Sequence, residues 1–232
     1  MNHNFVVEYV GNNDKIFTRS LLCKIRVVIF AAFKAFFDIT MSTILLILLS
    51  PILLIISILI KIDSKGPILF RQIRTGKHGK PFTLYKFRTM SVDNDVYDFS
   101  KHDQHTRIGK ILRKTSLDEL PQLLNMIKGE MSFIGPRPWI TDYYDNMTEI
   151  QRHRYCVRPG LTGLAQVNGR NTITIFDKIN YDLTYIKNYS LKQDIKIIFL
   201  TIKAIFGCKG ADAGKKVIRN ELDDLKKSKK YK

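Results

Sequence analysis

The residue types that could do chemistry gather in the segment SLDELPQLLNMIKGEMSFIGPRP, residues 116–138. It holds two adjacent acids, Asp118 and Glu119, and one arginine, Arg137, that stands between two prolines. A carboxylate can serve as a nucleophile or as a ligand of a divalent cation, and a guanidinium on a restrained backbone suits phosphate oxygens. The pattern indicates chemistry on a phosphorylated substrate.

A structural interpretation competes for the same acids. Ser116 and Glu119 have the spacing of a helix capping box, and acids in a first helical turn suit the helix dipole. Pro121 weakens this interpretation, because a proline at that position removes a helical hydrogen bond. The sequence shows no Ser-His or Cys-His constellation that could supply another nucleophile. The spacing alone favours the cap, whereas Pro121 and the lack of another nucleophile keep catalysis open.

The charge balance points to an anionic partner. The chain has 232 residues, with 38 Lys and Arg against 21 Asp and Glu and a formal net charge of +17. This length can bury one core of ordinary size, and the sequence marks no second domain. Nucleic acid, a phospholipid surface and a phosphorylated substrate are the candidate partners. The 3 cysteines are far apart, which predicts neither a disulfide framework nor a zinc site and favours a reducing, cytosol-facing location.

The apolar run ITMSTILLILLSPILLIISILI, Ile39–Ile60, is long enough to cross the hydrocarbon of a bilayer. Ser50-Pro51 lies in its middle, where the proline predicts a bend. Basic residues flank both ends, so the usual asymmetry between the two sides of a membrane is missing. They are Lys15, Arg19, Lys24, Arg26, Lys34, Lys61, Lys65, Arg71 and Arg74. A kinked span and a re-entrant hairpin with arms of about ten residues both fit, and the Ser50 hydroxyl could satisfy a carbonyl freed by Pro51.

The polar body predicts short elements. Residues 66–90 indicate two strands around the turn GKHGKP, and 108–112 and 117–127 have helical spacing. Residues 191–206 are amphipathic, which fits either a helix packed on the core or one that lies in a membrane interface. The C-terminal LDDLKKSKKYK is expected to be flexible. A further set, His102, Asp103 and His105, invites a metal site, but such residues in an exposed loop are usually just solvated.

Six motifs occur in a fixed order, and on them the chain resembles the bacterial sugar transferases. These are monotopic phosphoglycosyl transferases that begin the assembly of capsule, O-antigen and glycoprotein glycans. The motifs are FDI followed by LSP, GPILFRQIRTG, YKFRTM, RKTSLDELPQLLNMIKGEMSFIGPRP, RPGLTGLAQVNGR and YDLTYIKN, which run from about Lys34 to Phe206. No large N-terminal domain precedes them, so the small form of the family is expected. Neither a P-loop nor a dinucleotide-binding pattern occurs.

The resemblance implies a reaction and roles for named residues. A UDP-sugar passes its sugar phosphate to undecaprenyl phosphate, and undecaprenyl-diphospho-sugar and UMP are the products. Asp118 is implied as the nucleophile that forms an aspartyl phosphosugar, and Asp118 and Glu119 are implied to hold Mg²⁺. The implied substrate-binding residues are Arg88, Arg113, Arg137, Arg158 and Asp182, the last without an assigned role.

The expected fold class is α+β and mostly helical, with a re-entrant helix-break-helix, amphipathic interfacial helices and a small β-hairpin. The resemblance implies a membrane helix that is entered through Asp38 and broken at Ser50-Pro51. The expected division is an N-terminal extension over 1–33, a membrane hairpin over 34–62, a catalytic core over 63–206 and a basic, flexible tail over 207–232. The expected location is the inner (cytoplasmic) membrane, with the active site on the cytoplasmic face against anionic lipid. The sequence leaves open whether the protein forms a homodimer.

Two other functions are also consistent with the basic composition of the chain. A membrane-anchored binding protein for nucleic acid or anionic lipid would account for the basic charge. Aromatic residues do not interleave with the basic clusters as a nucleic-acid stacking platform requires, so no nucleic-acid partner is expected. A metal-dependent phosphodiesterase would instead hydrolyse the nucleotide sugar without using an acceptor.

Overall fold

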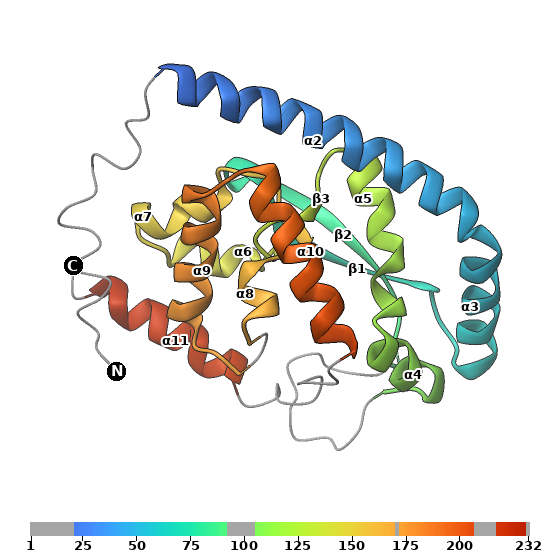
Figure 1. Cartoon of the computed structure of the whole chain (residues 1–232). Coiled ribbons are helices and arrows are strands. Elements are labelled where there is room, and N and C mark those ends of the chain that lie inside the picture. Colours follow the sequence, from blue (N-terminus) through green and yellow to red (C-terminus); the bar gives the residue numbers. More distant parts are fainter. Residues whose placement is uncertain (1–20, 92–104, 170–171, 207–216, 231–232) are drawn as a thin grey trace.

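The structure is a computed structural model that describes residues 21–91, 105–169, 172–206 and 217–230. Helices dominate it and surround two small sheets, as expected for a mostly helical α+β fold (Figure 1). The helices are α2 (Leu21–Leu48), α3 (Ser50–Asp63), η1 (Lys77–Gly79), α4 (Arg107–Thr115), η2 (Leu117–Gln122), α5 (Leu123–Ile127), α6 (Thr141–Asp145), α7 (Glu149–Arg152), η3 (His153–Tyr155), α8 (Leu164–Val167), α9 (Ile175–Lys187), α10 (Leu191–Phe206) and α11 (Val217–Lys230). The strands are β1 (Leu69–Thr75), β2 (Pro81–Phe87), β3 (Ser132–Ile134) and β4 (Gly160–Thr162).

A break at Leu49 separates the first two helices, and Figure 1 shows α3 turning away from the line of α2. Pro51 has no amide hydrogen, so the carbonyl of Ile47, four residues earlier, loses its helical donor. The Ser50 hydroxyl donates to that carbonyl over 2.7 Å. The predicted break at Ser50-Pro51, with the serine as the substitute donor, is confirmed.

α2 is longer than the apolar run predicts, because helix-compatible residues continue back from Ile39 to Leu21. It has 28 residues, and its part Val27–Leu48 is long and apolar enough to cross a membrane, by length and composition. Three polar residues at every fourth position, Lys34, Asp38 and Ser42, are buried against the protein core. The exposed residues of α2 include Val28, Ile29, Phe33, Phe36, Phe37, Ile39, Ile44, Ile47 and Leu48. The helix therefore turns three polar residues, together with apolar ones such as Leu45 and Leu46, toward the core and exposes mainly apolar residues.

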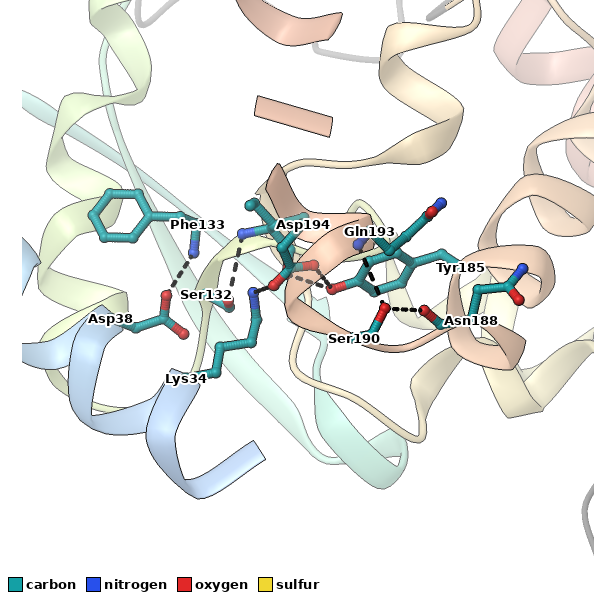
Figure 2. Close-up of polar contacts among 10 residues, drawn as sticks. Lys34, Asp38, Ser132, Phe133, Tyr185, Asn188, Ser190, Gln193 and Asp194 are labelled. Atoms are coloured by element: carbon teal, nitrogen blue, oxygen red, sulfur yellow. Dashed lines mark hydrogen bonds and ion pairs between the residues drawn. The ribbon is translucent and has the colours of Figure 1, made fainter. Parts of the chain in front are cut away.

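A buried ion pair joins α2 to α10, as Figure 2 shows. Lys34 Nζ contacts Asp194 Oδ2, and the Tyr185 hydroxyl donates to Asp194 Oδ1 over 2.7 Å. One turn further along α2, Asp38 Oδ1 accepts a hydrogen bond of 3.3 Å from the backbone N–H of Phe133. Removing one member of a buried pair leaves the other charge uncompensated, so these contacts fix the register of α2 on the core.

The structure contains a local hairpin and a second sheet that brings two glycine-containing segments far apart in the sequence together. β1 and β2 form the expected antiparallel hairpin, and β3 pairs in parallel with β4. A methyl group added at Gly160 would lie 2.1 Å from the backbone N of Gly135, so the two backbones meet at van der Waals distance only because neither residue has a side chain. The GPRP segment that follows β3 is thereby packed against the RPG segment that precedes β4.

The element that carries the acids begins as a 3-10 helix. Residues 117–127, predicted as one helix, divide into η2 and α5, and Pro121 lies inside η2. A proline deprives the first turn of an α-helical bond, which explains the tighter start. Asn125, fully buried, binds the hairpin: its side chain accepts from the Tyr85 N–H over 3.1 Å and donates to the Thr83 carbonyl over 2.7 Å. The acids and β2 are thereby held together.

The expectation of a flexible C-terminal segment is wrong for Val217–Lys230, which form α11. Leu225 is completely buried in a cluster with Tyr143 and Ile179, and Glu221 pairs with Lys178 of α9 over 2.6 Å. A short charged segment is a marginal helix by itself, but docking of Leu222 and Leu225 and the ion pair of Glu221 stabilise it.

Candidate active site

Asp118 and Glu119 lie in η2, directly after a sharp turn in the chain. Ser116 ends α4 in the left-handed conformation, with φ of 59°, and its side chain caps no helix. The Glu119 side chain binds Lys86 and Arg137 instead of a backbone amide. The capping-box interpretation is therefore wrong, and both acids are available for tertiary contacts.

Two cations converge on one oxygen of Glu119. Lys86 Nζ donates to Oε1 over 2.7 Å, and Arg137 Nη2 donates to the same oxygen over 2.8 Å. Burial by itself would raise the pKa of the Glu119 carboxyl, but the Arg137 guanidinium and the Lys86 ammonium outweigh it and hold that pKa well below its usual range. Glu119 is thus ionised and serves as the centre of a cation cluster.

Asp118 is in a different electrostatic situation. Its carboxylate makes no hydrogen bond or ion pair within the described part of the chain. Burial raises the pKa of Asp118, Lys86 opposes this shift, and the negative charge of Glu119 raises the pKa further. A half-buried, uncommitted carboxylate with raised basicity has the properties of a nucleophile.

Lys86 is the residue of the site that reasoning from the sequence missed. It lies in β2 two residues after Leu84 and four after Phe82, which are both buried. Every second residue of a strand points to the same face, so Lys86 points the same way as these two. A lysine at a strand position that predicts an apolar side chain was the available signal. Burial lowers the pKa of Lys86, and Glu119 opposes that shift.

Two of the expected arginines meet the acids. Arg113 of α4 interacts electrostatically with Asp118, and its Nη1 lies 3.0 Å from His105 Nε2. Arg137 binds Glu119 with one nitrogen, and 42% of its side chain is exposed, against 18% for Glu119. Part of its guanidinium fork is therefore accessible to a ligand. Together with Lys86, these arginines form a basic rim around two carboxylates, which suits a diphosphate substrate.

Arg88 lies elsewhere, at the end of α3. Its guanidinium donates to the backbone carbonyl of Lys65 and, over 2.8 Å, to that of Ser64. A third bond of 2.9 Å reaches the Ser64 hydroxyl. These contacts satisfy carbonyls at and just after the C-cap of α3, and the assignment of Arg88 as a substrate ligand stays a prediction.

The other two expected ligands interact with residues other than the acids of the site. Arg158 interacts electrostatically with Asp38 of α2 and with Tyr189. Asp182 of α9 is buried and pairs with Arg154 over 2.7 Å. Their roles in substrate binding stay predictions.

The donor set of the site fits Mg²⁺. This ion prefers oxygen ligands and is commonly held by one or two carboxylates together with water and substrate phosphate. Asp118 is uncommitted, and Glu119 uses only Oε1 for its two cations. The described residues contain no group of three or more His, Cys, Asp or Glu side chains that could hold a metal without such help. His102 and Asp103, part of the alternative metal site, lie outside the described residues.

Comparison with known proteins places this site in a family. Residues 29–208 match the family model described as bacterial sugar transferase. The chain is 44% identical over 179 residues to the uncharacterized sugar transferase EpsL of Bacillus subtilis (strain 168), which covers 76% of this chain and 89% of the relative. It is 47% identical over 182 residues to the UDP-glucose:undecaprenyl-phosphate glucose-1-phosphate transferase of Klebsiella pneumoniae, with 73% of this chain and 39% of the relative covered.

A third relative, the UDP-glucose:undecaprenyl-phosphate glucose-1-phosphate transferase of Caulobacter vibrioides, is 42% identical over 184 residues, with 74% of this chain and 69% of the relative covered. The chain thus spans less than half the length of the Klebsiella relative and most of the length of the other two. The family match includes every residue of the cation cluster and both acids. The expected resemblance is confirmed, and the chain belongs to the bacterial sugar transferase family.

Proposed function

We propose that the protein transfers a sugar 1-phosphate from a UDP-sugar to undecaprenyl phosphate, which releases UMP and forms undecaprenyl-diphospho-sugar. This is the first membrane step in the assembly of a surface or glycoprotein glycan. Family membership and the names of the Klebsiella and Caulobacter relatives support this reaction class. The observation that carries the proposal is an uncommitted carboxylate, Asp118, beside a carboxylate that gathers two cations, Glu119.

In the first step an oxygen of Asp118 attacks the sugar-linked phosphorus of the UDP-sugar. The bond between that phosphorus and the oxygen of UMP breaks, and UMP leaves with the bonding electrons. Asp118 then carries the sugar phosphate as an acyl phosphate. Arg113, Arg137 and Lys86 offset the negative charge of the diphosphate while this bond changes.

In the second step a phosphate oxygen of undecaprenyl phosphate attacks the same phosphorus. The bond to Asp118 breaks, and the carboxylate is regenerated. A covalent intermediate lets two anionic substrates use one basic site in turn. Glu119 keeps Arg137 and Lys86 in place throughout. Asp118 and the second oxygen of Glu119 would hold Mg²⁺, which when bound neutralises charge on the phosphates.

Outward-facing apolar residues support a membrane location for this lipid reaction. On α10 the residues Ile195, Ile198, Phe199 and Ile202 are exposed, whereas Asp194 and Ile197 are buried. α10 thus packs on the core through Asp194 and Ile197, and its exposed apolar residues support an additional contact with the membrane interface. With the outward apolar face of α2, these residues fit a chain anchored by a re-entrant hairpin in the cytoplasmic membrane, with its site on the cytoplasmic, anionic face.

UMP release tests the proposal. Purified protein in detergent is incubated with Mg²⁺ and, in turn, UDP-glucose, UDP-galactose or UDP-N-acetylgalactosamine, with and without undecaprenyl phosphate. We expect continuous UMP release with acceptor and release limited to one equivalent per enzyme without it. Asp118→Asn should abolish both the continuous release with acceptor and the single equivalent without it. Asp142→Asn, a change of an exposed acid on α6, should abolish neither. Continuous release without acceptor would establish the rival phosphodiesterase.

A further inference from the structure

Arg154 is a completely buried cation that does not touch the acids of the site. Its side chain is 0% exposed. Nε and Nη2 donate to one oxygen of Asp182 over 2.9 and 2.7 Å, and Nη2 also donates to the backbone carbonyl of Arg137 over 2.9 Å. Burying a charge costs several kcal/mol unless it is paired, and Asp182 supplies the pairing charge. One arginine thus links α9 to the backbone of the phosphate-binding candidate.

Aromatic rings restrict Arg154 further. Its guanidinium carbon lies 3.7 Å from the centre of the Trp139 ring and 4.8 Å from that of Tyr155. Trp139 follows GPRP directly, so Arg154 contacts the segment at two points, the carbonyl of Arg137 and the ring of Trp139. An arginine held by an ion pair and two rings has one orientation available to it.

The GPRP segment depends on contacts of this kind, because its prolines have no N–H to donate. Its carbonyl groups are the positions at which the rest of the protein can hold it. Gly160 N–H donates to the carbonyl of Pro136 over 2.9 Å, and Arg154 donates to the next carbonyl, that of Arg137. The prolines restrain φ at their own positions, and the bond from Arg154 orients the peptide plane after Arg137, which sets the direction of its side chain.

We propose that Arg154 and Asp182 are positioning residues for the sugar-phosphate transfer. Asp182 orients Arg154, Arg154 holds the backbone of Arg137, and Arg137 reaches Glu119 and the substrate phosphate. This inference rests on the proposed function and gives Asp182 a role that needs no contact with substrate. A misplacement of about 1 Å at a group that binds the reacting phosphate costs on the order of a hundredfold in rate, so the effect is measurable.

A double-mutant cycle on kcat/KM tests the inference, with the UDP-sugar that supports the fastest UMP release. Arg154→Lys keeps the charge but cannot bind Asp182 and the Arg137 carbonyl in the same fork geometry. We expect Arg154→Lys and Asp182→Asn each to lower kcat/KM about ten- to hundredfold. In an Arg137→Ala background, neither change should lower kcat/KM further, because the side chain through which they act is gone. The inference would be overturned if the loss of kcat/KM in the double variant equalled the product of the losses in the two single variants.

A matched control separates positioning from stability. Glu221→Gln breaks another ion pair of α9, the one that Lys178 forms with Glu221 of α11. It should lower the melting temperature and leave kcat/KM of the folded protein unchanged. If Arg154→Lys does not fold, Asp182→Asn completes the cycle, and rates are expressed per folded molecule from circular dichroism. An active wild type whose Asp182→Asn variant keeps its kcat/KM would refute the inference alone, whereas an inactive wild type would refute the proposed function and the inference with it.

Discussion

At the scale of single residues, Asp118 and Glu119 are neighbours in the chain, yet their pKa values shift in opposite directions. Burial raises the pKa of Asp118, whereas the Arg137 and Lys86 charges overcome burial and depress the pKa of Glu119. A raised acid pKa means that ionised Asp118 destabilises the folded state at neutral pH. A depressed pKa means that ionised Glu119 stabilises it above the unfolded pKa of about 4.3. Two adjacent acids therefore have opposite effects on stability.

This difference predicts opposite results for two isosteric substitutions. At pH 7, Asp118→Asn should abolish turnover while leaving stability equal to or above that of the wild type. Glu119→Gln should lose about 1–3 kcal/mol of unfolding free energy, because Lys86 and Arg137 lose their shared partner. Urea unfolding in detergent between pH 4.5 and 7.5 provides the measurement.

The pH dependence checks the sign. The unfolding free energy that Asp118→Asn gains over the wild type should shrink as the pH falls toward the raised pKa of Asp118, since the wild-type carboxyl then becomes neutral. The deficit of Glu119→Gln should persist over this range, because the pKa of Glu119 in the folded state lies well below it. A large stability loss in Asp118→Asn would show that this acid has a structural role.

At the scale of elements, Arg88 connects the end of α3 to the hairpin β1-β2. It extends from the end of β2 to the last carbonyls after α3, and only 6% of it is exposed. We predict that Arg88→Gln lowers the unfolding free energy by about 1–3 kcal/mol, since it removes the charged donor that binds the Ser64 and Lys65 carbonyls. KM for the UDP-sugar should not change.

Arg71→Gln is the control for this prediction, because Arg71 is an exposed arginine on β1 of the same hairpin. It should leave stability close to that of the wild type. Steady-state kinetics and thermal melts in detergent distinguish the two roles of Arg88. A higher KM with an unchanged melting temperature would make Arg88 a substrate ligand, as the family resemblance implies.

At the scale of the whole molecule, we predict that the break at Ser50-Pro51 decides which side of the membrane the N-terminal region occupies. In a re-entrant hairpin, residues before α2 and the body after α3 share the cytoplasmic side. Single cysteines at Asn13 and at Glu149, in a background without the native cysteines, should therefore react with a membrane-impermeant thiol reagent only after the cells are opened. Labelling at position 13 in intact cells would establish a true span.

Straightening the helix should change this result. Replacing Ser50-Pro51 by Ala-Ala restores a donor for the Ile47 carbonyl and favours a continuous helix. Position 13 should then become accessible from outside in part of the population, while Glu149 stays inaccessible. The same accessibility of position 13 in both proteins would show that the break does not control topology.

The sequence by itself determined the elements whose causes are local. Pro51 deprives one carbonyl of its donor, and the adjacent Ser50 replaces it, so the break needed no knowledge of the fold. Two short strand-like runs on either side of the turn-rich GKHGKP determined the hairpin β1-β2 in the same way. The acids, the arginine between prolines and the order of the motifs identified the family, because these depend on residue identity alone.

Only the tertiary structure decided which charges meet. Lys86 and Arg137 lie on separate segments and reach Glu119 because the fold brings both β2 and the GPRP segment to η2. Arg88, two residues beyond Lys86, binds the end of α3 instead. Asp182 was identifiable as an acid of the family motif, but its burial against Arg154 depends on how α9 packs. Contacts between residues far apart in sequence follow from the packing of whole elements, and local patterns of residue type carry no information about that packing.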